Sequence, residues 1–228
     1  MGEALNDIRR LSTRARRKWS LLNTIARLLS MVLLSTAIVQ FLSLDFLQGA
    51  ETLLLLGFSF LPGYWLRRTV PAYVQHIHSL CLLMAVANCT LGILFNLYRI
   101  SAYYDKLLHL VNPALVAFIA FLVLYVPAAH QSGDRPLLIS SIVATGALAA
   151  LLTLGLAAVW EIVEYAADNL LAQQSQGSPV MGPLDDTMWD LILGAVGSVA
   201  GVRAAALQVQ KQVQRRVQKA NSFAHHHV

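Results

Sequence analysis

Carboxylates and an imidazole lie near the ends of three apolar stretches in the second half of the chain. The pairs are Asp105 with His109, Glu161 with Glu164, and Asp186 with Asp190. A spacing of three or four residues places both members of a pair on the same face of a helix. Carboxylates at membrane depth are costly and usually face the interior of a helix bundle. The three faces therefore predict one shared polar site.

Carboxylates with an imidazole are a usual ligand set for a divalent metal ion, whose charge offsets their mutual repulsion. We therefore expect a divalent ion of unspecified identity as the cofactor. Its candidate ligands are Asp105, His109, Glu161, Glu164, Asp186 and Asp190. A bound ion would activate water or polarise a phosphoryl or carbonyl oxygen, with Glu161 and Glu164 as candidate catalytic groups. Without an ion, the carboxylates would share protons, as in a proton relay or a gated ion path.

Three further residues are candidates for substrate binding. Asn112 follows His109 by three residues and so extends the same helix face. Arg99 and Lys106 are cations that lie beside the site in the sequence, and they suit an anionic lipid or a sugar-phosphate headgroup.

Simpler roles stay open for some of these residues. Asp105 and Lys106 suit an ion pair at a helix start, and Asp186 suits a helix cap. Glu161 and Glu164 have no such role, because the apolar stretch before them predicts that they lie near a helix C-terminus, where the helix dipole disfavours negative charge.

The elements that must carry these residues are membrane-spanning helices. Of 228 residues, 57% are hydrophobic and only 13% are charged, and the mean hydropathy is +0.58. Such a composition excludes an ordinary soluble domain. Six apolar stretches approach the ~20 residues that a spanning helix needs: Leu28–Leu44, Thr52–Leu66, Thr69–Tyr98, Leu107–Gly133, Pro136–Trp160 and Thr187–Val209. We therefore predict an all-α polytopic membrane protein with a six-helix transmembrane bundle. Thr52–Leu66 is the weakest stretch, because it is short and contains Pro62-Gly63.

Positive charge predicts the orientation. Placing the amino-terminal arm in the cytoplasm leaves only Arg99 and Lys106, among 17 Lys and Arg residues, on the outer side. We expect a basic cytoplasmic tail at 1–20, the transmembrane domain at 21–207 and a polar helical cytoplasmic tail at 208–228. Both termini then lie in the cytoplasm, and the acidic site lies at the outer leaflet. The basic arms suit attraction to anionic lipid, and no pattern in them indicates nucleic-acid binding.

The last stretch also carries small residues on one face. Gly194, Gly197 and Gly201 follow Asp190 on roughly the same side of the predicted helix. Small residues at such spacing let neighbouring helices approach closely. The face that carries Asp186 and Asp190 is therefore predicted to be buried.

Three motifs in order resemble the YjdF-type family of bacterial inner-membrane proteins. They are Tyr104-Asp105-Lys106-x-x-His109, then Trp160-Glu161-x-x-Glu164-Tyr165, then Asp186-Thr187-x-x-Asp190 followed by Gly194 and Gly197. A looser similarity is to VanZ-like proteins, associated with glycopeptide resistance and the outer face of the membrane. The chain departs from these at Glu164, where Gln is common, and at Gly194, where Asn is usual. The resemblance implies a multi-pass protein of the bacterial inner membrane with a buried acidic site.

Three functions follow as hypotheses. The first is a divalent-metal site that binds or acts on a lipid-linked or envelope substrate. The second is a small proton-coupled transporter or permease that uses the same carboxylates. The third is a non-catalytic membrane scaffold, which would tolerate their replacement. The partners expected are the lipid bilayer and an anionic lipid or lipid-linked substrate. The sequence predicts no oligomeric state.

Overall fold

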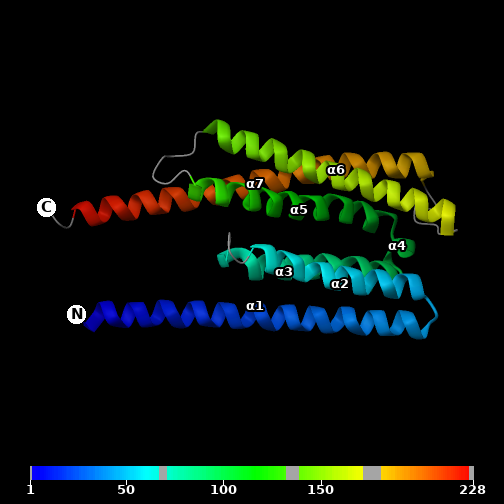
Figure 1. Cartoon of the computed structure of the whole chain (residues 1–228), viewed down its shortest axis with the longest axis horizontal. Helices are drawn as coiled ribbons and strands as arrows, with labels where there is room; N and C mark the ends of the chain where they lie inside the picture. The colour runs from blue at the N-terminus through cyan, green and yellow to red at the C-terminus, as the bar shows by residue number, and fades with distance from the viewer. Residues whose placement is uncertain (1, 67–70, 132–138, 172–180, 226–228) are drawn as a thin grey trace. The chain divides into compact units, whose positions relative to one another are not determined.

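In the computed structural model, the protein is described at residues 2–66, 71–131, 139–171 and 181–225. Regular structure in these residues is helical (Figure 1). The chain divides into two compact units, Met1–Ile100 and Ser101–Val228, and each unit is described by itself. An all-helical fold is what the sequence predicts.

The first unit contains α1 (Gly2–Leu42), α2 (Phe46–Leu66), α3 (Pro71–Ala85), the π-helix η1 (Val86–Leu94) and the short α4 (Leu97–Ile100). A tight turn joins α1 to α2, with Leu44 at a φ of 66°. Apolar side chains of α1, α3 and η1 form the core of this unit, which includes Leu33, Leu82 and Cys89.

The second unit contains three long helices, α5 (Ala102–Gln131), α6 (Ile139–Leu171) and α7 (Pro183–His225). α5 packs against both α6 and α7, and α6 also packs against α7. Pro113 and Pro127 lie inside α5, where neighbouring helices make such breaks in hydrogen bonding tolerable. The predicted polar tail continues α7 without a break to His225.

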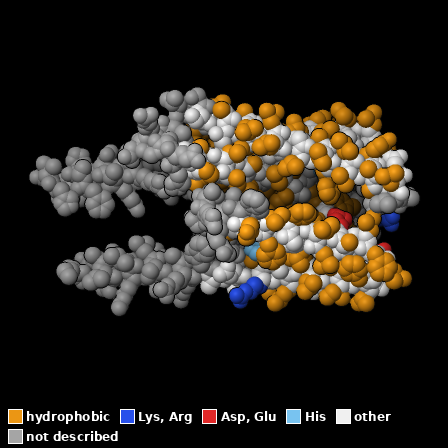
Figure 2. Space-filling view, viewed as in Figure 1, with side chains coloured by type: hydrophobic (Ala, Val, Ile, Leu, Met, Phe, Trp, Pro, Cys, Tyr) orange, Lys and Arg blue, Asp and Glu red, His pale blue; other side chains and the backbone are white. Residues whose placement is uncertain are grey.

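Five helices in the described residues are long and apolar enough to cross a membrane: Ser20–Leu42, Val74–Leu94, Tyr103–Ala129, Ser141–Leu170 and Pro183–Lys211. A sixth apolar helix, Phe46–Leu61, is shorter. The predicted count of six spans is therefore not confirmed, and the second segment is again the weak one. Hydrophobic side chains cover much of the described surface in each unit, as lipid-facing helices require (Figure 2).

Several helix boundaries differ from the predicted ones. α2 begins at Phe46, before the predicted Thr52, because Glu51 lies within the helix and does not mark its start. α6 continues to Leu171, beyond the end of the apolar stretch at Trp160. The uncharged stretches stop at charged residues, whereas the helices include those residues and direct them into the protein.

Candidate functional site

Close contact between α7 and α5 positions the site. A Cβ atom added at Gly197 would lie 2.2 Å from the carbonyl oxygen of Leu110, and one at Gly201 would lie 2.0 Å from that of Ala114. Only glycine at these two positions permits such an approach of backbones. The predicted small-residue face of α7 is thereby confirmed as a packing face.

One turn from the site, three helices meet in a layer of small side chains. A Cβ atom at Gly194 would lie 3.4 Å from the Cβ of Ala157 on α6 and 3.8 Å from the Cγ of Pro113 on α5. Residues four positions away lie one turn along the same face of each helix. They are Asp190 on α7, Glu161 on α6 and His109 on α5. The small layer thus brings one acidic or basic group from each helix to the same level.

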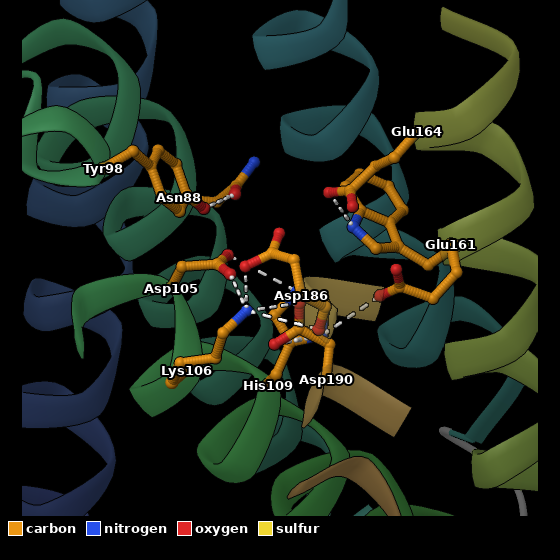
Figure 3. Close-up of polar contacts among 10 residues, drawn as sticks. Asn88, Tyr98, Asp105, Lys106, His109, Glu161, Glu164, Asp186 and Asp190 are labelled. Carbon is orange, nitrogen blue, oxygen red and sulfur yellow. Dashed lines mark hydrogen bonds and ion pairs between the residues drawn. The ribbon is translucent and has the colours of Figure 1, made fainter. Parts of the chain in front are cut away.

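Lys106 lies among three aspartates (Figure 3). Its Nζ atom is 2.6 Å from Asp186 Oδ1, 2.6 Å from Asp190 Oδ2 and 3.0 Å from Asp105 Oδ2. The Asp190 side chain is only 1% exposed and that of Lys106 is 12% exposed. Lys106 is therefore a largely buried cation held by carboxylates from α5 and α7.

His109 connects this group to α6. Its Nε2 atom is 3.4 Å from Asp105 Oδ1, and its Nδ1 atom is 3.5 Å from Glu161 Oε1 and 3.9 Å from Asp190 Oδ1. Asp190 Oδ1 is buried and has no hydrogen-bond partner among the described residues. The imidazole thus faces carboxylates on both sides.

Glu164 lies one turn beyond Glu161 on α6. Together with Asp105, Lys106, His109, Glu161, Asp186 and Asp190 it makes up the cluster. The Oε1 atom of Glu164 accepts a hydrogen bond of 2.7 Å from Trp160 Nε1 (Figure 3). Trp160 is therefore a hydrogen-bond partner of an acidic residue on the same helix. Because α6 ends at Leu171, Glu161 and Glu164 both precede its last turn. The predicted conflict with the helix dipole is therefore weakened, since that effect falls off within the last turn.

All six candidate metal ligands thus lie in the second unit. Two groups of three among them have ligand atoms close enough together to hold one metal ion. Asp105, His109 and Asp190 form one such group, and His109, Glu161 and Glu164 form another. Within each group, one ligand atom per residue lies within 4.8 Å of the others. His109 belongs to both groups.

Of the two simpler roles, the ion pair of Asp105 with Lys106 is present and the helix cap at Asp186 is not. Lys106 does pair with Asp105, but it lies closer to two aspartates of α7. Asp186 does not cap α7, because that helix begins at Pro183 and the Asp186 N–H donates to the carbonyl of Gly182. Proline at the first helical position is a common helix start.

The three candidate substrate-binding residues belong to different units, two to the second and one to the first. Lys106 lies within the cluster, and Asn112 is half-buried on α5, three residues beyond His109. Arg99 belongs to the first unit, where its side chain is exposed on α4.

The first unit has polar contacts of its own around Asn88 of η1. The Nδ2 atom of Asn88 donates to Glu51 Oε1 at 3.1 Å. Its Oδ1 atom accepts from the Tyr98 hydroxyl (Figure 3). Asn88 of η1 thus connects α2 with α4 within this unit. Sequence spacing did not connect Glu51 or Tyr98 with Asn88. Glu51 belongs to another helix, and the π-helix η1 and the short α4 interrupt the α-helical periodicity between Asn88 and Tyr98.

These features define a multi-pass helical membrane protein with a buried acidic and histidine cluster. The family described as predicted membrane protein (DUF2238) matches residues 21–211. The chain belongs to this family, which is the YjdF-type family that its motifs resemble. None of the comparisons supports the similarity to VanZ-like proteins. No curated protein and no solved structure matches the chain.

Proposed function

We propose that the cluster of the second unit is a divalent-metal site that binds or acts on a lipid-linked or envelope substrate. The proposal depends chiefly on one observation. Asp190 Oδ1 is buried without a hydrogen-bond partner among the described residues, and it lies 3.9 Å from His109 Nδ1. A buried carboxylate oxygen in that state is costly unless something else binds it.

Charge supports the same proposal. The cluster has five carboxylates, at Asp105, Glu161, Glu164, Asp186 and Asp190. Among the described residues, its basic groups are Lys106 and His109. Several negative charges would stay uncompensated even with both of these protonated. Taking unpaired charge out of water costs several kcal/mol per ion. A divalent cation offsets two such charges at once.

The orientation of His109 suits metal binding. A proton on Nε2 would be directed to Asp105, which leaves the Nδ1 lone pair facing Glu161 and Asp190. Ligating histidines usually donate their other ring N–H to a carboxylate in this manner. We infer that Nδ1 of His109, Glu161, Glu164 and Asp190 Oδ1 are the inner ligands and that Asp105 orients the imidazole.

Substrate and location follow from the charge pattern. With the basic arms on the cytoplasmic side, the cluster lies at the outer end of α5, α6 and α7, in the bacterial inner membrane. A metal ion there would polarise a phosphoryl or carbonyl oxygen of a lipid-linked or envelope molecule. Asn112, in the same unit as the cluster, is a candidate to contact the headgroup of that molecule.

Metal content tests the proposal. The protein would be purified in detergent after growth with several divalent metals, and its bound metals measured by mass spectrometry. We expect a near-stoichiometric divalent ion, a large loss for Glu161→Gln, and no loss for Asp185→Asn. Asp185 is the matched control, because it is an exposed carboxylate next to the buried Asp186.

The controls separate the hypotheses. A folded wild-type protein without a divalent ion, even after incubation with excess metal, would refute the metal site. Flux in proteoliposomes that depends on a proton gradient and is lost in Asp190→Asn would then favour the transporter. Equal metal content in wild type and Glu161→Gln would refute the ligand assignment.

A further inference from the structure

Lys106 lies among oxygen atoms of Asp105, Asp186 and Asp190, which form the aspartate half of the cluster. Its three contacts come from residues on two helices, at 2.6, 2.6 and 3.0 Å. The backbone carbonyl of Asp186 adds a fourth oxygen at 3.5 Å. A small cation surrounded by carboxylate and carbonyl oxygens has the coordination that hard divalent ions prefer.

The two halves of the cluster share Asp190. Oδ2 of this residue contacts Lys106 at 2.6 Å, while Oδ1 faces His109 and has no hydrogen-bond partner among the described residues. One carboxylate thus bridges two neighbouring positions for positive charge, as carboxylates do between the two ions of dinuclear metal sites. Lys106 fills one position, and the other is the site proposed above.

We infer that Lys106 is a built-in cation that limits this cluster to a single metal ion. It stands at a second metal position formed by Asp105, Asp186 and Asp190. Loss of its charge would convert a one-metal site into a two-metal site. This inference rests on the proposed function in one respect, namely that the wild-type cluster binds one metal ion.

Geometry supports the exchange. Calcium binds oxygen at about 2.3–2.6 Å, close to the two shorter Nζ–O distances of 2.6 Å. Asp105 is the only one of the three aspartates more than one-tenth exposed, with 27% of its side chain accessible. It can therefore move the few tenths of an ångström that a metal ion requires. The α7 carboxylates are held by the glycine contacts with α5.

The experiment measures bound ions per chain in three proteins. Wild type, Lys106→Met and Lys106→Arg would be purified in detergent and equilibrated with calcium or manganese. Lys106→Met should bind one more ion than wild type. Lys106→Arg keeps the charge and should bind the same number as wild type. A double variant, Lys106→Met with Asp186→Asn, has the net charge of wild type but lacks a ligand, and should gain no ion.

Each outcome bears on the inference. One ion in wild type and two in Lys106→Met supports it. No ion in wild type and one in Lys106→Met refutes the proposed function but supports a metal position at Lys106. Equal numbers in both refute the inference. If Lys106→Met folds only when metal is present, as judged by gel filtration and helical circular dichroism, the ion replaces the ammonium group. If it does not fold even with metal, the inference is wrong.

Discussion

Replacing Gly201 by alanine should separate α7 from α5. The new Cβ atom would lie 2.0 Å from the Ala114 carbonyl oxygen, 2.8 Å from its carbonyl carbon and 3.0 Å from its Cα. All three atoms belong to the backbone, so no side-chain rotation relieves the contact. Ordinary van der Waals contact begins at 3.4 Å, so the backbones must move apart by about 1.4 Å.

The cost can be estimated from overpacking. Forcing a methyl group into a well-packed interface costs typically about 1–3 kcal/mol. Because alanine forms helix better than glycine by about 1 kcal/mol, an uncrowded glycine should show the opposite sign. Gly155 provides that comparison, since it lies inside α6 and has nothing within 4 Å of its added Cβ.

Thermal unfolding in detergent measures the difference. For a chain of this size, about 1 kcal/mol corresponds to roughly 2–4 °C. We expect Gly201→Ala to lower the unfolding temperature by several degrees and Gly155→Ala to leave it equal or raise it. A Gly201→Ala protein as stable as Gly155→Ala would refute the close packing of α7 on α5, and with it the basis for placing Asp190 beside Lys106.

Two further predictions concern the first unit. Tyr98→Phe removes the hydroxyl that donates to Asn88 Oδ1. It should destabilise the protein by about 0.6 kcal/mol and at most about 1.7, the range for hydrogen bonds between helices in membranes, as measured by denaturation in mixed detergent. Thr36→Val and Thr90→Val each break the 2.8 Å hydroxyl pair between α1 and η1. A double-mutant cycle should give a coupling of the same size, and strict additivity of the two variants would show that the pair is not formed.

The sequence predicted the helical class and the composition of the cluster, because periodicity and charge are local properties. An i, i+4 pair such as Asp105 and His109 lies on one face in any α-helix. The small face of α7 also predicted which side of that helix packs. These predictions did not require any knowledge of distances between helices.

The position of Lys106 was not predictable by the same reasoning. Its nearest charged neighbour in sequence is Asp105, which favoured a pair at the helix start. The contacts with Asp186 and Asp190 depend on how far α7 slides along α5. That register is fixed by Gly197 and Gly201 against Leu110 and Ala114, which the sequence does not pair.

The uncharged stretch that ends at Trp160 underestimates the length of α6 for a related reason. A charged residue was taken to mark the membrane boundary, yet the Glu161 side chain is only 6% exposed. Burial against α5 and α7 keeps it from lipid, and so the helix need not end there. The same reasoning explains α2, which begins before Glu51 because Asn88 of η1 donates a hydrogen bond to that carboxylate.

Holding several carboxylates together in the cluster costs free energy. The layer of small residues one turn away prevents the three helices from moving apart to relieve the repulsion. Gly194, Pro113 and Ala157 fix three helices at one level, and Asp190, His109 and Glu161 follow one turn away on the respective helices. Spreading these groups toward solvent would require the glycine contacts to open. Repulsion among the carboxylates is therefore relieved by bound positive charge, and Lys106 provides only part of it. A cation or a proton must supply the rest, and the metal measurements on wild type and Glu161→Gln decide which.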